Sequence, residues 1–271
     1  MAWLQIDFQS NSLCGNTRLD VFLPAETPPM LPPRPAGSLW KTVYLLHGFS
    51  GDSTHWLLNS NIQELSQRCD LAFVMLSGSN SFYLDGASSA ARYSTFIKEA
   101  VDFTRRVLPL SRERGDTTIA GLSMGGYGAV YNGLRWHETF GHIIALSSAF
   151  VLDQVDTATD EPNFLGLNRA YFLQTFGEHE NIMLSDRNPA ILAAKLMSEE
   201  TEPIDLYMAC GTEDFLLAPN RDVKKSLEET GFLFTYEEGP GTHDWAFWTP
   251  YLSRGLDRIG WLKPPPPSIF G

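Results

Sequence analysis

The chain has 271 residues, of which 43% are hydrophobic and 19% are charged, and its formal net charge at pH 7 is −12. This composition excludes an intrinsically disordered chain and is typical of a globular protein that buries a large core. The acidic balance argues against a nucleic-acid partner, because phosphate binding needs a basic surface. A membrane partner is not expected either, since no segment has the about 20 apolar residues of a membrane span.

The three cysteines, Cys14, Cys69 and Cys210, form no CxxC pair and are odd in number, which indicates reduced thiols. The N-terminal segment "MAWLQIDFQS" lacks the basic and apolar regions of a signal peptide. We therefore expect a cytoplasmic protein. The histidines show no HxxxH or HExxH spacing, and we expect neither a metal site nor a cofactor.

The chain begins with two segments, residues 3–9 and 17–24, in which apolar and polar residues alternate as in half-buried antiparallel strands. The proline-rich residues 24–37 follow, and we expect a stiff surface loop there. A second proline-rich segment, residues 264–271, ends the chain as a tail.

From residue 40 onward, apolar strands alternate with helices. We expect strands at 40–48, 70–78, 117–121, 142–148, 204–211 and 232–239. We expect helices around 59–68, over 93–108, from about 125, over 219–230 and from 245 to about 262. Because the later strands are apolar throughout, this order predicts an α/β fold with a mostly parallel sheet covered by helices on both faces.

Residues 150–203 interrupt the alternation with acidic and aromatic residues at irregular spacing. We interpret them as a cap-like insertion at the edge of the functional site and not as a separate domain. The chain is thus predicted to be a single domain over residues 1–271.

Ser123 lies in the pentapeptide "GLSMG" (residues 121–125), between an expected strand and an expected helix. The pattern G-x-S-x-G is common by chance, but the strand–turn–helix context is what a nucleophile elbow requires. There a tight turn projects the serine hydroxyl from the edge of the sheet, and glycines leave room for the crowded backbone. We therefore predict that Ser123 is a nucleophile.

A serine hydroxyl needs a base that accepts its proton. With a nucleophile elbow the chain order is serine, acid, histidine, so the base lies downstream of Ser123. His243 in "GPGTHDW" comes just after the last expected strand, near the carboxyl edge of the sheet. We expect His137 in the helix that follows the elbow, His142 at the start of a strand and His179 in the insertion, where they look structural. The sequence therefore favours His243.

The acid that orients the base is expected after the preceding strand, where "CGTEDFLL" places Glu213 and Asp214. We favour Asp214, with Glu213 as the nearest rival, and interpret Asp222 as a charge on a helix surface.

Two main-chain amides are needed to stabilise the oxyanion of the tetrahedral intermediate. The N–H of Met124 lies at the start of a helix, where amides lack partners, and that of Phe49 lies in the loop "LLHGFSG". We predict that these two amides form the oxyanion hole, while His47 braces the loop.

The segments "HGFSGDSTHWLLNSNI", "TTIAGLSMGGYGA", "YFLQTFG", "CGTEDFLL" and "GTHDW" together resemble the esterase D-type branch of the α/β-hydrolases. The similarity is greatest to the tributyrin esterase group, whose relatives include acetyl and feruloyl esterases of plant carbohydrate esters. It spans roughly residues 5–262 and implies an α/β-hydrolase fold with Ser123, Asp214 and His243 as the triad. It also leaves a homo-oligomer open.

The sequence departs from one branch of that superfamily. S-formylglutathione hydrolases carry a cysteine in the oxyanion loop, where this chain has Gly51. A metal-independent serine esterase for small acyl groups is therefore the favoured function, with a small-molecule ester as its substrate. S-formylglutathione hydrolysis, acyl transfer on the same fold and a non-catalytic binding protein remain alternatives.

Aromatic residues on or beside the expected loops predict an apolar wall that suits an acyl chain, a phenolic acid or a sugar. We expect Trp56 and Trp245 to bind substrate, ahead of further candidates among Phe49, Phe82, Leu216 and Trp248.

Overall fold

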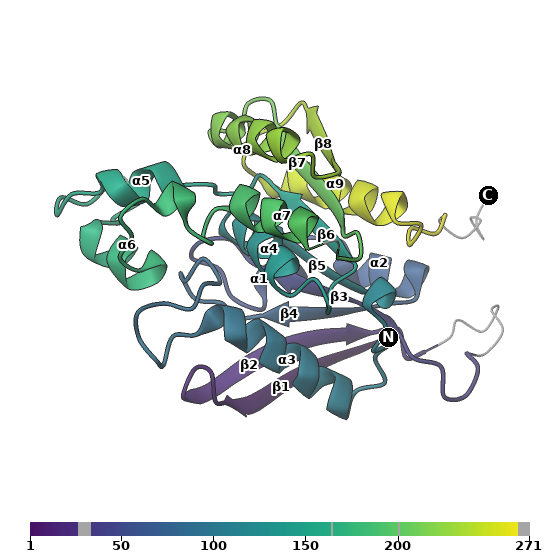
Figure 1. Ribbon diagram of the computed structural model, residues 1–271. Helices are drawn as coiled ribbons and strands as arrows, with labels where there is room; N and C mark the ends of the chain where they lie inside the picture. Colours follow the sequence, from purple (N-terminus) through teal and green to yellow (C-terminus); the bar gives the residue numbers. More distant parts are fainter. Residues whose placement is uncertain (27–33, 164, 200, 265–271) are drawn as a thin grey trace.

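A computed structural model describes residues 1–26, 34–163, 165–199 and 201–264 of the chain. Eight strands form one sheet in the order β1-β2-β4-β3-β5-β6-β7-β8 (Figure 1). The strands are β1 Ala2–Ser10, β2 Gly15–Leu23, β3 Lys41–Leu46, β4 Leu71–Leu76, β5 Thr117–Leu122, β6 His142–Leu146, β7 Asp205–Gly211 and β8 Phe234–Gly239.

The helices are α1 His55–Asn59, α2 Ile62–Cys69, α3 Tyr93–Val107, α4 Met124–Arg135, α5 Leu152–Thr157, α6 Arg169–Phe176, α7 Pro189–Ser198, α8 Leu217–Thr230 and α9 Trp245–Arg258. Two 3-10 turns, η1 Arg114–Asp116 and η2 Ile182–Leu184, complete the elements. Among the described residues, no helix is both long enough and apolar enough to span a membrane.

The sheet changes from antiparallel to parallel along its width. Strands β1 and β2 form an antiparallel hairpin, and β2 also pairs antiparallel with β4. All pairs from β4 to β8 are parallel. Each residue of β4 and β5 is buried, whereas β1 alternates between exposed and half-buried residues. The predicted alternation is therefore confirmed for β1 but not for β2, whose residues 19–23 are all buried because β2 pairs with both β1 and β4.

Helices cover both faces of the sheet, as predicted. Successive residues of β3 point to opposite faces, so that Tyr44 and Leu46 pack with α3, α4, α7 and α8. Val43 and Leu45 pack with α1, α2 and α9 on the other face. The central parallel strands are thus buried on both sides, which explains why their sequences are apolar without alternation, whereas the edge strand β8 is half-buried.

Two sequence-based boundaries and one missing helix need correction. Helix α9 ends at Arg258, because Gly260 takes a left-handed conformation (φ 71°) and the Trp261 N–H bonds back to Leu256 O. The helix after the elbow ends at Arg135, so His137 follows it. The short helix α1 was not predicted at all.

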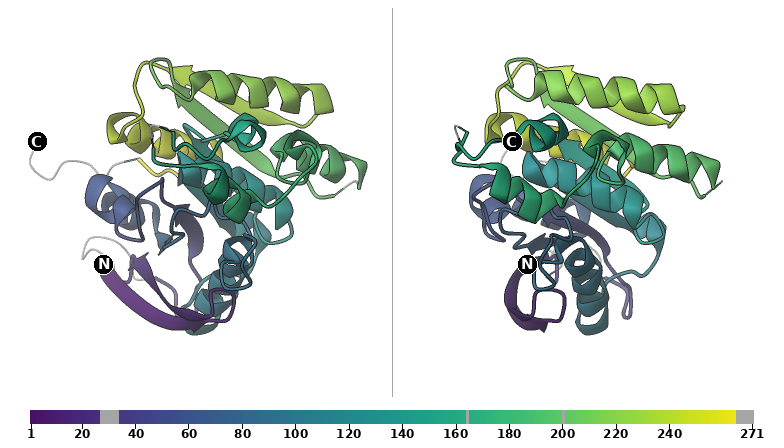
Figure 2. Two further views of the ribbon diagram at one scale, coloured as in Figure 1. Left: turned by 90° about the vertical axis from the view of Figure 1, so that its left-hand side faces the viewer. Right: turned by 60° about the vertical axis from the view of Figure 1, so that its left-hand side comes forward.

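The insertion divides into two parts. Helices α5 and α6 project from one end of the sheet in Figure 1 and face the viewer in the left panel of Figure 2. Helix α7, by contrast, packs against α4 and α8 in the helical layer. The cap-like part therefore ends before α7, which the irregular spacing of residues 150–203 did not reveal.

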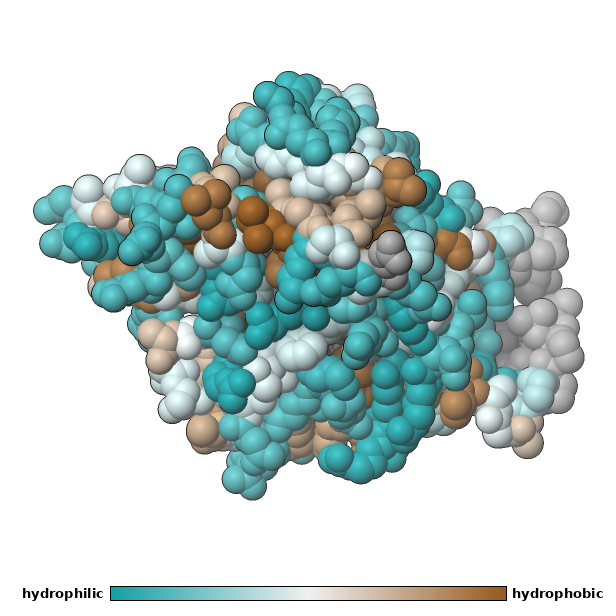
Figure 3. Space-filling view, in the orientation of Figure 1, coloured by the Kyte–Doolittle hydropathy of each residue, from teal (hydrophilic) through white to brown (hydrophobic). Residues whose placement is uncertain are grey.

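Residues 27–33 of the first proline-rich segment and residues 265–271 of the second lie outside the described residues. Over the rest of the face shown in Figure 3, hydrophilic side chains predominate and apolar ones form small groups.

Arg187 anchors the insertion to the rest of the domain. Its guanidinium donates to Tyr131 Oη at 2.7 Å and to the carbonyls of Phe176 and Asp85, each at 3.3 Å. The side chain is only 15% exposed. Three otherwise distant segments therefore share one charged donor.

We expect Arg187→Met to lower the free energy of unfolding by about 2–3 kcal/mol, because it removes the charged donor to the Asp85 carbonyl and to Tyr131 Oη. The control is Lys195→Met, since Lys195 is 66% exposed and lies 3.8 Å from Glu199; its effect should stay within about 0.5 kcal/mol. Urea unfolding measures both, and equal effects would contradict the anchoring role.

Candidate active site

Ser123 lies at a corner between β5 and α4 with φ 55° and ψ −121°. A non-glycine residue rarely adopts a positive φ, so the surrounding structure must hold it there. Its N–H donates to Leu146 O at 2.9 Å, and its carbonyl accepts from Gly126, Tyr127 and Ala149 at 2.9–3.1 Å. The main chain of Ser123 is thus fixed by both β6 and α4.

The glycines of the motif are required by close backbone contacts. A Cβ at position 121 would lie 2.1 Å from Gly125 O, and one at position 125 would lie 2.4 Å from Leu46 O. Neither position leaves room for a side chain. The strand and helix can therefore meet in this tight turn only if both residues are glycine.

His243 follows β8 and lies against Ser123. Its Nε2 is 2.9 Å from Ser123 Oγ, and its Nδ1 is 2.9 Å and 3.0 Å from the two carboxylate oxygens of Asp214. In the neutral imidazole, Nδ1–H would donate to Asp214 while Nε2 accepts from the serine hydroxyl. The structure thus brings together the three residues predicted from distant segments.

Asp214 is the better of the two acid candidates. Its side chain is fully buried, and its Oδ1 accepts the N–H of Leu216 at 2.8 Å. Burial raises the pKa of Asp214, but the hydrogen bonds from His243 and the Leu216 amide outweigh it, and the net pKa is lowered. Glu213 instead accepts the N–H of Gly241 at 2.7 Å, and Asp222 is exposed on α8.

The two amides predicted for the oxyanion hole lie beside the serine. A Cβ at Gly48 would be 3.3 Å from Ser123 Cβ, so the chain that leads into Phe49 contacts the nucleophile. Among the described residues, neither the Phe49 nor the Met124 N–H has a hydrogen-bond partner. Both amides are therefore free to bind a substrate oxygen.

His47 braces this loop. It is fully buried, its Nδ1 is 2.7 Å from Gly48 O, and its Nε2 is 2.8 Å from the N–H of Gly78. A carbonyl needs a donor and an N–H needs an acceptor, so the ring is neutral with its proton on Nδ1. Burial lowers the pKa of His47 to about 4. These contacts agree with the predicted bracing role.

The insertion reaches the same loop through α6. Tyr171 Oη donates to Asn80 O at 2.6 Å, and Asn80 Oδ1 accepts the N–H of Ser50 at 2.8 Å. The Tyr171 and Phe49 rings meet edge to face at 6.3 Å. The conformation of the oxyanion loop therefore depends on the insertion as well as on His47.

The predicted role of Trp56 in substrate binding is wrong. Only 1% of Trp56 is exposed, and its Nε1 donates to Leu46 O at 3.0 Å, so it belongs to the core. Trp245 is half-buried and packs edge-on against Trp56 at 5.1 Å and against Trp248 at 5.3 Å. Trp245 therefore remains a candidate for substrate contact.

One aromatic residue of the site was missed. Phe215 is 63% exposed, and its ring centroid lies 4.6 Å from that of His243. Its place directly after Asp214 in "EDFLL" was the available signal, because a residue beside the acid must lie near the base.

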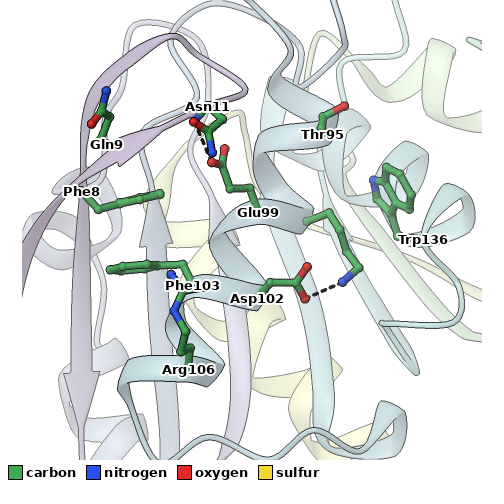
Figure 4. A pocket seen from close by; sticks show the side chains of 10 residues that line it. Phe8, Gln9, Asn11, Thr95, Glu99, Asp102, Phe103, Arg106 and Trp136 are labelled. Atoms are coloured by element: carbon green, nitrogen blue, oxygen red, sulfur yellow. Dashed lines mark hydrogen bonds and ion pairs between the residues drawn. The ribbon is translucent and has the colours of Figure 1, made fainter.

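The cavity in Figure 4 lies elsewhere. It has a volume of about 490 Å³ and lies between β1 and α3, with Phe8 stacked on Phe103 at 4.3 Å. A second cavity of about 520 Å³ lies between α5 and α6. Neither contains a residue of the triad.

Comparison with known proteins identifies the family of this chain. The profile of the Esterase family matches residues 10–259. The chain belongs to the Esterase family. It is 38% identical to an acetyl esterase of Caldicellulosiruptor saccharolyticus over 95% of this chain and 97% of that protein.

Solved structures with a fold similar to that of this chain also include serine hydrolases and esterases. The fluorophosphonate-binding serine hydrolase F of Staphylococcus aureus has a TM-score of 0.83 and 27% identity, covering 95% of this chain and 98% of its own. An S-formylglutathione hydrolase of the same organism has a TM-score of 0.79 and 26% identity, with the same coverage. A ferulic acid esterase shares the fold at 21% identity and a TM-score of 0.73, covering 97% of this chain and 99% of its own. The esterase is thus a serine carboxylic ester hydrolase with the α/β-hydrolase fold.

We expect the bracing by His47 to make the stability of this esterase pH-dependent. Its folded pKa of about 4 lies below its ordinary value of 6.5, so the unfolded chain binds more protons between these values. Stability contributed by neutral His47 is therefore present above pH 6.5 and is lost as the pH falls toward 4.

His47→Gln removes this titration. Between pH 7.5 and pH 5, the parent protein should lose about 2 kcal/mol more unfolding free energy than the variant. Urea unfolding at both pH values measures the difference, in which the other titrating groups cancel. Equal losses in the two proteins would show that His47 is not held neutral.

Proposed function

We propose that Ser123, His243 and Asp214 catalyse the hydrolysis of esters with small acyl groups, acetyl esters of carbohydrates in particular. The observation that carries this proposal is the continuous line of contacts from buried Asp214 through His243 to Ser123 Oγ, each between 2.9 and 3.0 Å. The 38% identity to an acetyl esterase supports the acyl group.

The proposed reaction has two halves. Ser123 Oγ attacks the ester carbonyl while His243 Nε2 accepts the hydroxyl proton, and the Phe49 and Met124 amides stabilise the oxyanion. The tetrahedral intermediate then breaks the bond to the alcohol oxygen, which takes the proton from Nε2. Water attacks the acyl-enzyme by the same route and releases the acid. Asp214 stays ionised throughout and stabilises the imidazolium.

The space around Gly51 separates this function from S-formylglutathione hydrolysis. A Cβ at position 51 would lie 2.6 Å from His55 Nδ1 and 3.1 Å from His47. His55 therefore occupies the place that a cysteine side chain would need. Acyl transfer to a sugar or alcohol uses the same residues, and products formed with an added acceptor would reveal it. A cytoplasmic location and a homo-oligomer stay predictions.

Ser123→Ala should fold normally and lose activity on nitrophenyl acetate by about 10⁶-fold, because the nucleophile acts as a unit with its base. Ser226→Ala, on the distant helix α8, is the matched control and should keep full activity. An organophosphate should label the parent protein and the control but not Ser123→Ala. Turnover retained in Ser123→Ala would reject the proposal.

A survey of acyl groups tests the substrate class. Acetyl and butyryl esters should react faster than octanoyl and feruloyl esters, and S-formylglutathione should react slowest, because this chain has Gly51 where the S-formylglutathione hydrolases carry a cysteine in the oxyanion loop. Steady-state kcat/KM for each ester is the measurement. A preference for S-formylglutathione would overturn the assignment to small oxygen esters.

A further inference from the structure

Phe215 is an exposed aromatic residue in contact with the proposed general base. Its ring lies 4.6 Å from the His243 ring at an interplanar angle of 51°, and 63% of the residue is exposed. Trp248 packs edge-on against the same imidazole at 4.9 Å and is only 6% exposed. Trp248 therefore supports His243 from within the core, while Phe215 presents an apolar surface to solvent.

The chemistry defines which half of the substrate lies near Phe215. The alcohol oxygen takes its proton from His243 Nε2, so it must come within hydrogen-bond distance of that atom. The acyl carbonyl lies instead against the Phe49 and Met124 amides. A ring contacting the imidazole is thus placed beside the alcohol half of the ester.

The charge nearby indicates what kind of alcohol fits. Glu213 precedes the triad acid, and its carboxylate is held by the N–H of Gly241 at 2.7 Å, two residues before His243. The hydrogen bond from Gly241 lowers the pKa of Glu213, so the group is anionic at neutral pH. An anionic leaving group would be repelled, whereas a neutral ring would not.

We propose that Phe215 is a platform for the leaving alcohol and that this alcohol is a neutral ring, such as the face of a sugar or an aryl group. The inference rests on the proposed function, since it uses His243 as the proton donor to the alcohol. Aromatic rings bind such faces through apolar contact and stacking. Phe215 forms no covalent bond and acts only by non-covalent contact with the alcohol.

Phe215→Ala tests this platform through two substrate series measured as kcat/KM, which reports the steps up to and including acylation, the step in which the alcohol leaves. One series keeps the acetyl group and changes the alcohol from methanol to xylose and phenol, so that methyl acetate is compared with acetylated xylose and phenyl acetate. The other keeps methanol and changes the acyl group from acetyl to butyryl and hexanoyl.

We expect the preference for the ring alcohols over methanol to fall about tenfold in Phe215→Ala, while the preference among acyl groups stays as in the parent. Phe215→Tyr should restore the ring preference. Leu233→Ala, which removes a side chain on a residue that is 85% exposed before β8, is the control and should change neither ratio.

Two results would overturn the proposal. An unchanged alcohol preference would show that Phe215 does not bind the alcohol, and an equal loss on every ester would show that it only shields His243. Organophosphate labelling of Ser123 in Phe215→Ala separates these results from a failure of the triad itself. Labelling should persist if the proposed function holds and the platform alone is lost.

Discussion

The close approach of β5 and α4 is the constraint on which the active site depends. With a hypothetical Cβ of Gly121 only 2.1 Å from Gly125 O, strand and helix pack without any side chain between them. This packing turns the chain sharply enough to give Ser123 its positive φ and to direct the hydroxyl outward from the sheet. The partners of Ser123 then need only lie on neighbouring strands.

The parallel strands bring these partners close to Ser123. Strands β3, β5, β7 and β8 all end at the same edge of the sheet, and the oxyanion loop, Ser123, Asp214 and His243 follow them directly. Residues 120 positions apart in the chain thus meet at 2.9 Å. The surroundings also determine the protonation of the buried groups. Hydrogen bonds to Asp214 keep its buried carboxylate charged, whereas burial keeps His47 neutral.

The sequence predicted these features because each has a local signature. Apolar runs mark buried parallel strands, and glycines around a serine mark a turn that excludes Cβ atoms. Side-chain exposure has no such signature: Trp56 and Phe215 both lie on or beside the expected loops, yet one fills the core and the other faces solvent. The extent of the insertion was also not readable, because α7 packs as a layer helix through contacts with α4 and α8 that its own sequence does not specify.

The contacts of α6 explain why an insertion so far along the chain belongs to the site. Tyr171 holds Asn80, and Asn80 holds Ser50, the residue after Phe49. In the same loop, His47 joins Gly48 to Gly78. The residues on both sides of Phe49 are therefore held by hydrogen bonds to the loop that follows β4. A main-chain donor that must face a developing charge gains from such fixation, because it then needs no reorganisation when the charge forms.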